Sequence, residues 1–392
     1  MTSEWHEVPL RELVGYISKG IAPSYAEEAS ETTIRVLNQK CNRNFRISYG
    51  DSRLHDTLKK KVPPERYVKP DDILINSTGA GTAGRIAQIE DVPSATTIDG
   101  HMILIRSNRK VTQKFLGYAL KAHQWEVLQL DEGSTGQTEL NRDRLLDEIM
   151  INYPVSFDEQ NAIVGTLESI DRKLIVNEQL NDNLQQQAAA LFSSLYDRTN
   201  TEVRFTDLIQ ILGGGTPKTG ENTYWNGNIA FFTPKDVGTP YTLITEKTIT
   251  EEGLSHCNSR LYPVNTVFVT ARGTVGKVGM SGVPMAMNQS CYALVGKETH
   301  QLLVYFYTLK VVDRLKHKAS GAVFDAITTK DFESEQIMKL SDDDARAFLC
   351  IAEPMFQKVL NNCIENLRLS TLRDSLLPKL MSGEIDVSAV QL

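Results

Sequence analysis

Hydrophobic residues recur at alternating steps of four and three along residues 158–196, a stretch with no Pro and a single Gly. This spacing predicts one long helix whose apolar seam packs against another helix, as in a coiled coil. Asp158 and Glu159 at the start of the stretch suit the positive end of a helix dipole. The expected seam positions are Ile163, Leu167, Ile170, Leu174, Asn177, Asn181, Leu184, Ala188, Leu191 and Leu195.

The same pattern returns 185 positions later, and Asn again interrupts it at two matching places. The second set of seam positions is Phe348, Ala352, Met355, Val359, Asn362, Asn366, Leu369, Arg373, Leu376 and Leu380. Polar residues in an apolar seam lower stability but fix register and partner. We therefore predict that the two helices pack on each other and that four residues set their register: Asn177, Asn181, Asn362 and Asn366. Two unrelated surface helices are the alternative.

Each helical stretch follows a segment of about 150 residues that mixes strand-like and helix-like patterns. The loop GTAGRI at residues 81–86 in the first segment returns as GTVGKV at 273–278 in the second, 192 positions later. A turn of small residues precedes each long helix, at 133–140 and 319–327. The sequence thus predicts a direct internal repeat of half the protein.

We expect a mixed α/β fold built as a pseudo-twofold repeat. Residues 1–157 and 198–341 are the expected α/β domains, and residues 158–197 and 342–392 the expected helices, the second with a carboxyl-terminal tail. Antiparallel packing of the helices is preferred, although the short connections also permit a parallel pair. A helix of roughly 38 residues is about 57 Å long and could set the distance between two binding domains.

Composition narrows the class of protein. No apolar run approaches membrane-spanning length and no signal segment opens the chain, so we expect a cytoplasmic protein without a membrane. Five Cys without CxxC spacing argue against disulfides and zinc. The formal net charge is −7, but residues 35–66 carry nine basic and three acidic residues, whereas residues 158–197 carry two basic and seven acidic ones. A nucleic-acid partner is therefore compatible with the charge distribution.

One motif suggests an enzyme. Residues 79–84 form a literal GxGxxG after a strand-like run, with Asp99 further on, as in a dinucleotide-binding site. The residues after Gly84 predict a strand and a turn instead of a phosphate-binding helix. A tight turn between two strands is the simpler interpretation, and the common catalytic motifs are absent. The sequence therefore favours a binding protein over an enzyme.

Several motifs carry a family resemblance. The carboxyl-terminal LPKLMSGEI at residues 377–385 and the runs GGTP at 214–217, YWNG at 224–227 and TPKD at 233–236 resemble the DNA-specificity subunit of type I restriction-modification systems. The first segment departs from this pattern, with KGIAP at residues 19–23 in place of GGTP and no clear counterpart of YWNG or TPKD.

The resemblance implies two target-recognition domains, each reading one half of an asymmetric bipartite site in double-stranded DNA. It implies no catalysis by this chain, which would join two modification (adenine methyltransferase) subunits, while restriction (motor-nuclease) subunits complete the enzyme. S-adenosylmethionine, ATP and Mg would belong to those partners. Helix faces outside the seam and the tail at residues 378–387 are the expected docking surface. A coiled-coil adaptor that binds protein and not DNA is the alternative.

Exposed basic and amide side chains on loops are the candidate DNA contacts. Cations suit phosphates, whereas Arg, Asn and Thr suit base edges. The candidate phosphate contacts are Lys40, Arg43, Arg46, Lys59, Lys60, Lys61, Lys218, Lys235, Lys277, Lys316 and Lys318. The candidate base contacts are Asn44, Asn76, Thr78, Arg85, Thr219, Asn222, Arg272 and Asn288.

Overall fold

The computed structural model describes residues 4–132, 139–238, 240–318 and 326–390. The chain divides into two compact units, one formed by Met1–Lys173 with Leu369–Leu392 and the other by Leu174–Arg368. We call them unit 1 and unit 2. Each unit combines one of the α/β segments with part of both long helices. The expected small-residue turns at 133–140 and 319–327 lie largely outside the described residues.

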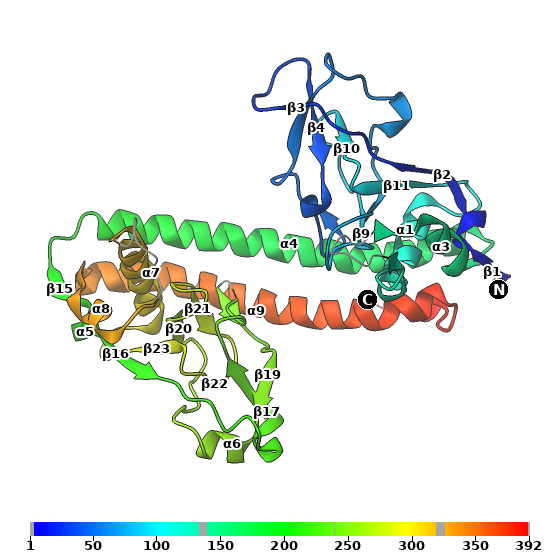
Figure 1. Cartoon of the computed structure of the whole chain (residues 1–392). Coiled ribbons are helices and arrows are strands. Elements are labelled where there is room, and N and C mark those ends of the chain that lie inside the picture. Colours follow the sequence, from blue (N-terminus) through cyan, green and yellow to red (C-terminus); the bar gives the residue numbers. More distant parts are fainter. Residues whose placement is uncertain (1–3, 133–138, 239, 319–325, 391–392) are drawn as a thin grey trace. The chain divides into compact units, whose positions relative to one another are not determined.

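Two long helices, α4 (Phe157–Tyr196) and α9 (Asp342–Met381), lie side by side (Figure 1). Within unit 2, Phe192 near the end of α4 packs on Phe348 near the start of α9, with ring centroids 5.5 Å apart. Within unit 1, Asp171 of α4 forms an ion pair with Arg373, late in α9. Residues late in α4 thus contact residues early in α9, and residues earlier in α4 contact residues later in α9. The predicted helix pair is confirmed, and its packing is antiparallel.

The four seam Asn residues pair crosswise inside unit 2. Asn177 Nδ2 donates to Asn366 Oδ1 at 2.8 Å, and Asn362 Nδ2 donates to Asn181 Oδ1 at 2.8 Å. An offset of 185 positions turns one pair into the other. The two pairs are therefore equivalent under the pseudo-twofold repeat. Each gives seam amides a hydrogen-bond partner, although Asn362 Oδ1 is buried without one among the described residues.

Unit 1 contains a sheet with the strand order β2-β11-β8-β9, in which neighbouring strands are antiparallel. Its strands are β2 (Val14–Lys19), β11 (Met102–Ser107), β8 (Ile73–Asn76) and β9 (Ile86–Gln88). A second sheet has the order β10-β4-β7-β3, with β10 (Thr96–Ile98), β4 (Thr33–Leu37), β7 (Arg53–Asp56) and β3 (Tyr25–Ala26). β1 (Trp5–Pro9) pairs with β14 (Met150–Pro154), β5 (Asn42–Arg43) with β6 (Arg46–Ile47), and β12 (Asp131–Glu132) with β13 (Glu139–Leu140).

Unit 2 repeats this order of strands. Its larger sheet runs β16-β23-β20-β21-β18, with β16 (Ile209–Gly213), β23 (Cys291–Gly296), β20 (Val267–Thr270), β21 (Val278–Ser281) and β18 (Tyr241–Thr242). The other sheet runs β19-β17-β22, with β19 (Lys247–Ile249), β17 (Trp225–Phe232) and β22 (Met285–Met287). β15 (Glu202–Arg204) pairs with β24 (Gln336–Met338). The predicted internal repeat is confirmed at the level of sheet topology.

Shorter helices cover the sheets at corresponding places. Unit 1 has α1 (Gln113–Ala122), α2 (Gln124–Val127), α3 (Arg142–Glu148) and the 3-10 turns η1 (Leu10–Glu12), η2 (Gln39–Cys41), η3 (Pro64–Arg66) and η5 (Val387–Ala389). Unit 2 has α5 (Phe205–Leu208), α6 (Glu251–Ser255), α7 (Gln301–Lys318), α8 (Thr329–Ser334) and η4 (Asn222–Tyr224). Thr112 starts α1 as its N-cap, because its hydroxyl accepts a hydrogen bond from Phe115 N. No helix among the described residues is both long and apolar enough to span a membrane.

The core of unit 2 explains why more residues of the long helices are buried than the predicted seam contains. In unit 2, Phe306 of α7 packs on Phe192 and on Phe356, with ring centroids 5.0 and 5.5 Å apart. Both partners are buried, although neither belongs to the predicted seam, whereas the seam residue Leu184 is half-buried. A heptad pattern describes only the contact between two helices, and α7 adds a third surface.

The GxGxxG motif forms a turn between two strands. Gly79, Gly81 and Gly84 have φ angles of 114°, 68° and 84°, a region that favours glycine. Strand β9 begins two residues after Gly84, at the place where a dinucleotide-binding fold needs a helix N-terminus. The strand that the sequence predicted here is present, and the motif offers no phosphate-binding helix.

Candidate nucleic-acid interface

Three short segments of unit 2 meet at the ends of its strands. They are residues 233–236 after β17, the loop 271–277 between β20 and β21, and the turn 288–290 before β23. Thr274 Oγ1 donates to Pro234 O at 3.1 Å, which joins the first two segments. Ala271 N donates to Ser290 O at 2.8 Å, which joins the second to the third. We call these the three reading segments.

The reading segments of unit 2 line a pocket of about 360 Å³. The structure brings three of the predicted DNA contacts together in its wall: Lys235, Arg272 and Asn288. Glu246 also lines the pocket and forms an ion pair with Lys235 at 3.6 Å. Lys247, a further cation of the wall, lies over the Trp225 ring at 5.7 Å. Sequence reasoning missed Lys247, because only the pairing of β19 with β17 brings it to this pocket.

Unit 1 has the same three segments, at residues 38–41, 77–85 and 99–101. Their backbone hydrogen bonds match those of unit 2. Ser77 N donates to His101 O at 2.8 Å, as Ala271 N does to Ser290 O. Ser77 therefore corresponds to Ala271. The residues that follow them, Thr78 in unit 1 and Arg272 in unit 2, hold equivalent positions in the two loops.

The turn before the last strand also matches. Asp99 Oδ1 accepts from His101 N at 2.9 Å, and Asn288 Oδ1 accepts from Ser290 N at 3.0 Å. Asp99 is buried, and burial raises the pKa of its carboxyl group above the usual value. The same turn therefore carries an acid in one unit and an amide in the other.

The first reading segment of unit 1 is the counterpart of TPKD that the sequence did not reveal. Asn38 N donates to Cys41 Sγ at 3.5 Å, and Thr233 N donates to Asp236 Oδ2 at 2.8 Å. In each segment the side chain three residues on accepts a hydrogen bond from the first backbone N–H, although one acceptor is a thiol and the other a carboxylate. This places Lys40 of unit 1 where Lys235 lies in unit 2.

A known family accounts for this architecture. The family profile described as "Type I restriction modification DNA specificity domain" matches residues 2–186 and 198–339. The chain belongs to this family. The first match covers the first α/β segment and continues into α4, and the second match covers the second α/β segment. Each unit thus contains one specificity domain, hereafter the first and the second recognition domain.

The relatives of this specificity-domain protein include named subunits. The type I restriction enzyme MjaIX specificity subunit of Methanocaldococcus jannaschii is 31% identical over 127 residues, which are 31% of this chain and 29% of that protein. The HindI specificity subunit of Haemophilus influenzae is 28% identical over 186 residues, 46% of this chain and 40% of that protein. The chain thus matches less than half the length of either relative. A solved type I restriction-modification system S subunit from M. genitalium has the same fold, with a TM-score of 0.63 and 17% identity over 97% of this chain and 96% of that one.

Two residues predicted to contact DNA have hydrogen-bond partners within the fold. Asn76 is fully buried and donates from Nδ2 to Gln39 O at 3.2 Å, so it ties two reading segments together and does not reach a base edge. Lys318 on α7 donates a hydrogen bond to Glu335, a carboxylate that is only 2% exposed. Arg314 also pairs with Glu335, so two cations supply the counter-charge that a buried carboxylate needs. The sequence could not show either partner.

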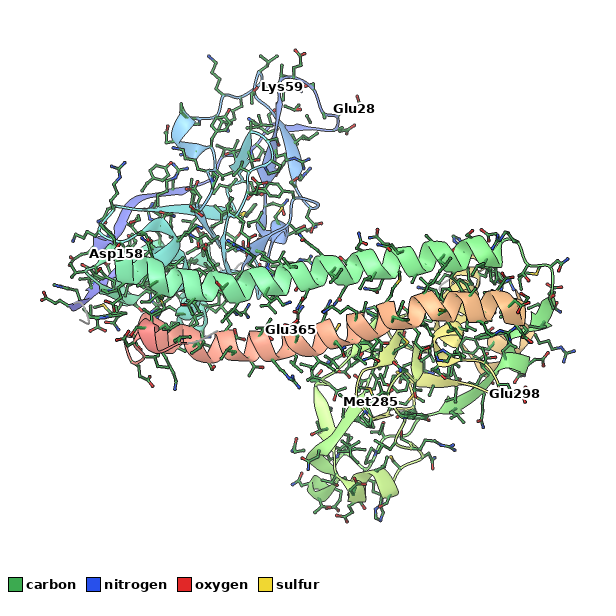
Figure 2. The ribbon with its side chains drawn as sticks, turned by 180° about the vertical axis from the view of Figure 1, so that it is seen from behind. Glu28, Lys59, Asp158, Met285, Glu298 and Glu365 are labelled. Carbon is green, nitrogen blue, oxygen red and sulfur yellow. The ribbon has the colours of Figure 1, made fainter. Side chains whose placement is uncertain are left out.

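The remaining candidates of the first domain lie on its surface. Lys59, Lys60 and Lys61 follow β7 and are exposed, and Figure 2 shows Lys59 at the edge of the domain. Lys60 Nζ donates to Ala22 O at 2.8 Å. Arg43 and Asn44 are exposed on the turn between β5 and β6, and Arg46 and Arg85 are half-buried. Thr78 Oγ1 lies 2.7 Å from His101 Nδ1.

In the second domain, three further candidates are exposed on the loop between β16 and β17. They are Lys218, Thr219 and Asn222. They do not line the pocket formed by the reading segments.

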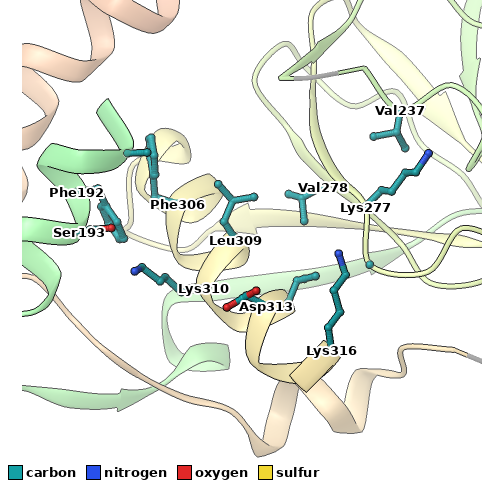
Figure 3. Close-up of a pocket in the computed structure, with 13 residues that line it drawn as sticks. Phe192, Ser193, Val237, Lys277, Val278, Phe306, Leu309, Lys310, Asp313 and Lys316 are labelled. Atoms are coloured by element: carbon teal, nitrogen blue, oxygen red, sulfur yellow. The ribbon is translucent and has the colours of Figure 1, made fainter. Parts of the chain in front are cut away.

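A second cavity of about 610 Å³ in the second domain brings two predicted phosphate contacts together (Figure 3). Lys277 projects from the start of β21 and Lys316 from α7, and both line its wall together with Lys310. Gly276, with φ 75°, makes this possible, because a Cβ there would lie 2.6 Å from Lys316 Cε. The cluster is suited to an anion such as a DNA phosphate.

Proposed function

We propose that the chain is the DNA-binding specificity subunit of a type I restriction-modification enzyme, and that each recognition domain reads one half of an asymmetric bipartite site. The observation that carries this proposal is one framework with two sets of side chains. Matching backbone contacts hold Lys40, Thr78 and Asp99 in the first domain. They present Lys235, Arg272 and Asn288 in the second. Different donors and acceptors on the same scaffold are what two different half-sites require.

The basic residues around the reading segments would bind the phosphate backbone and hold each domain in register on the duplex. We propose Lys40, Arg43, Lys59 and Lys61 for this role in the first domain, and Lys218, Lys277 and Lys316 in the second. The antiparallel α4 and α9 would then fix the number of unread base pairs between the half-sites.

The long helices would also dock two modification subunits, since a repeated chain offers two similar faces. Val176, Leu180 and Ile351 are each more than a third exposed on α4 or α9, outside the seam. Such unburied apolar residues on helix faces suit a partner protein. In this assembly, methylation and cleavage belong to the modification and restriction subunits, as do S-adenosylmethionine, ATP and Mg. The complex would act in the cytoplasm, on the host's DNA.

Single-molecule sequencing of adenine methylation in the native host, with and without this gene, tests the proposal. We expect loss of one asymmetric bipartite methylated motif on deletion, and its return on complementation. An unchanged set of methylated motifs would contradict it. Filter binding of the copurified complex to duplexes with and without the motif then separates a DNA-reading subunit from an adaptor that binds only protein.

A further inference from the structure

The pocket of the second recognition domain presents hydrogen-bond donors. Arg272 is exposed, lines the pocket and has no hydrogen-bond or ion-pair partner for its guanidinium among the described residues. A guanidinium has five N–H donors and no acceptor. Because Arg272 lies at the wall of a pocket, next to a fixed turn, its guanidinium is placed to bind the planar edge of a ligand.

Asn288 adds a donor beside Arg272, because its amide is oriented by the turn. Its Oδ1 accepts the hydrogen bond from Ser290 N at 3.0 Å, which leaves the Nδ2 donors available to a ligand of the pocket. The turn itself is held from behind by Gly214, where a Cβ would lie 2.2 Å from Asn288 O. The hydrogen bond from Ser290 N orients the amide, and the close approach of Gly214 restricts the backbone of the turn that carries it.

The pocket still presents mainly hydrogen-bond donors, although one carboxylate lines it. Glu246 forms an ion pair with Lys235 at 3.6 Å, and Lys247 and Arg272 remain as further cations of the wall. A ligand that enters between Arg272 and Asn288 therefore meets donors on both sides. It must itself carry acceptors.

Among base edges in the major groove, only guanine offers two adjacent acceptors, O6 and N7, and Arg binds them with two parallel hydrogen bonds. Adenine and cytosine would each direct an amino donor at the cationic wall. We propose that the pocket formed by Arg272 and Asn288 reads a guanine in one half of the recognised site. This inference rests on the proposed function and specifies it.

The first domain is expected to read a different base, because its equivalent positions are chemically different. Thr78 replaces Arg272, and its hydroxyl is already within 2.7 Å of His101 Nδ1. Asp99 replaces Asn288 and places a buried carboxyl group in the same turn. One domain thus has a donor pocket where the other has a short hydroxyl and an acid.

Methylation sequencing of host strains that carry Arg272→Ala, Arg272→Lys or Asn288→Asp tests the assignment. We expect both Arg272 variants to lose discrimination at one guanine position on the order of ten- to hundredfold, while the other half-site keeps its sequence. Lysine keeps the charge but loses the two-pronged geometry, so its retained methylation shows that the complex has assembled. Asn288→Asp, which copies the first domain, should reduce methylation of guanine-containing sites. Arg204→Ala, which removes an exposed Arg on β15 outside the pocket, is the matched control and should leave the motif unchanged.

Three outcomes would overturn the inference. Relaxation at an A·T pair would show that the pocket does not select acceptors. Uniform loss of methylation at all sites in Arg272→Ala, with the motif and its methylation both kept in Arg272→Lys, would make Arg272 a phosphate contact. An unchanged motif at full methylation in both Arg272 variants would exclude Arg272 as a reader. Failure of the proposed function is distinct, because the wild-type strain would then show no bipartite motif at all.

Discussion

Asp171 of α4 accepts a hydrogen bond from Arg373 of α9 at 3.0 Å, and this pair closes the helix seam in unit 1. Lys121 Nζ and Tyr118 OH of α1 donate to the same carboxylate at 3.1 and 2.9 Å. The side chains of Lys121, Asp171 and Arg373 are 11%, 16% and 17% exposed. A buried charged cluster therefore joins the first recognition domain to both long helices.

Unit 2 has no charge at the two corresponding positions of its helices. The offset of 185 relates Asp171 to Phe356 and Arg373 to Ala188, both of which are buried in an apolar and aromatic core. The two halves of a repeated chain thus fasten their domains by different chemistry.

Asp171→Ala should lower the free energy of unfolding by about 3 kcal/mol, because it leaves Lys121 buried without its carboxylate, while Arg373 keeps only its neighbour Asp374. Urea denaturation followed by circular dichroism measures the change. Asp182→Ala removes an exposed acid from the same helix and should change stability by no more than about 0.5 kcal/mol. A loss below about 1 kcal/mol for Asp171→Ala would mean that the cluster is not stabilising.

The same cluster should make unit 1 sensitive to acid. Burial alone would raise the pKa of Asp171, but Lys121, Arg373 and Tyr118 together hold this pKa below its usual value. A carboxyl group with a lowered folded pKa contributes stability above its unfolded pKa of about 3.9, and this contribution is lost as the pH falls through the folded value. Stability measured from pH 7 to pH 3 should therefore fall more in the wild type than in Asp171→Asn. Parallel curves for the two proteins would contradict this.

The seam pair Asn181 and Asn362 should couple strongly. Asn362→Leu removes the donor to Asn181 Oδ1 and leaves a nearly buried amide unsatisfied, which should cost about 1–3 kcal/mol. The double variant with Asn181→Leu should recover that loss, since the seam becomes apolar, but it should lose the fixed register. A double-mutant cycle in urea measures the coupling, and light scattering detects mispaired oligomers. Additive losses with a monodisperse double variant would exclude a register role.

Sequence alone predicts the helix pair because its signals are local and repeated. A period of 3.5 with Asn at matching seam positions specifies two partners, and the repeated loop at residues 81–86 and 273–278 identifies the duplicated domain. The width of the buried stripe is a tertiary property, since Phe192 and Phe356 are buried only where α7 packs on them.

The candidate site could be predicted only in part. Lys235, Arg272 and Asn288 were identifiable as loop residues with suitable donors, but their common pocket depends on the sheet that joins their strands. The sequence did not show that Lys40 is equivalent to Lys235. The hydrogen bond that closes each turn is accepted by Cys41 Sγ in one segment and by the Asp236 carboxylate in the other. Asn76 was predicted as a base contact because sequence cannot show that it is buried. Nor can sequence show that Gln39 O accepts the hydrogen bond of its amide.

Lys40→Ala should weaken binding of the complex to cognate and random DNA alike and reduce the slope of log affinity against log salt by about one. Lys40 is exposed in the first reading segment, so its ammonium group is available for a phosphate. Lys60→Ala should have a smaller effect, because Lys60 Nζ already donates to Ala22 O. Fluorescence anisotropy at several salt concentrations measures both slopes. A loss confined to cognate DNA would make Lys40 a base contact.

Gly214→Ala should disturb the second reading pocket through the backbone. A Cβ at residue 214 would lie 2.2 Å from Asn288 O, so the turn that orients the Asn288 amide must shift, whereas residue 213 has nothing within 4 Å of a Cβ. We expect Gly214→Ala to cost about 1–3 kcal/mol of stability and to lower methylation of the cognate site, while Gly213→Ala changes neither beyond about 0.5 kcal/mol. Thermal unfolding and methylation sequencing measure the two effects separately. Unaltered methylation in Gly214→Ala despite lowered stability would mean that the placement of the Asn288 turn does not control recognition.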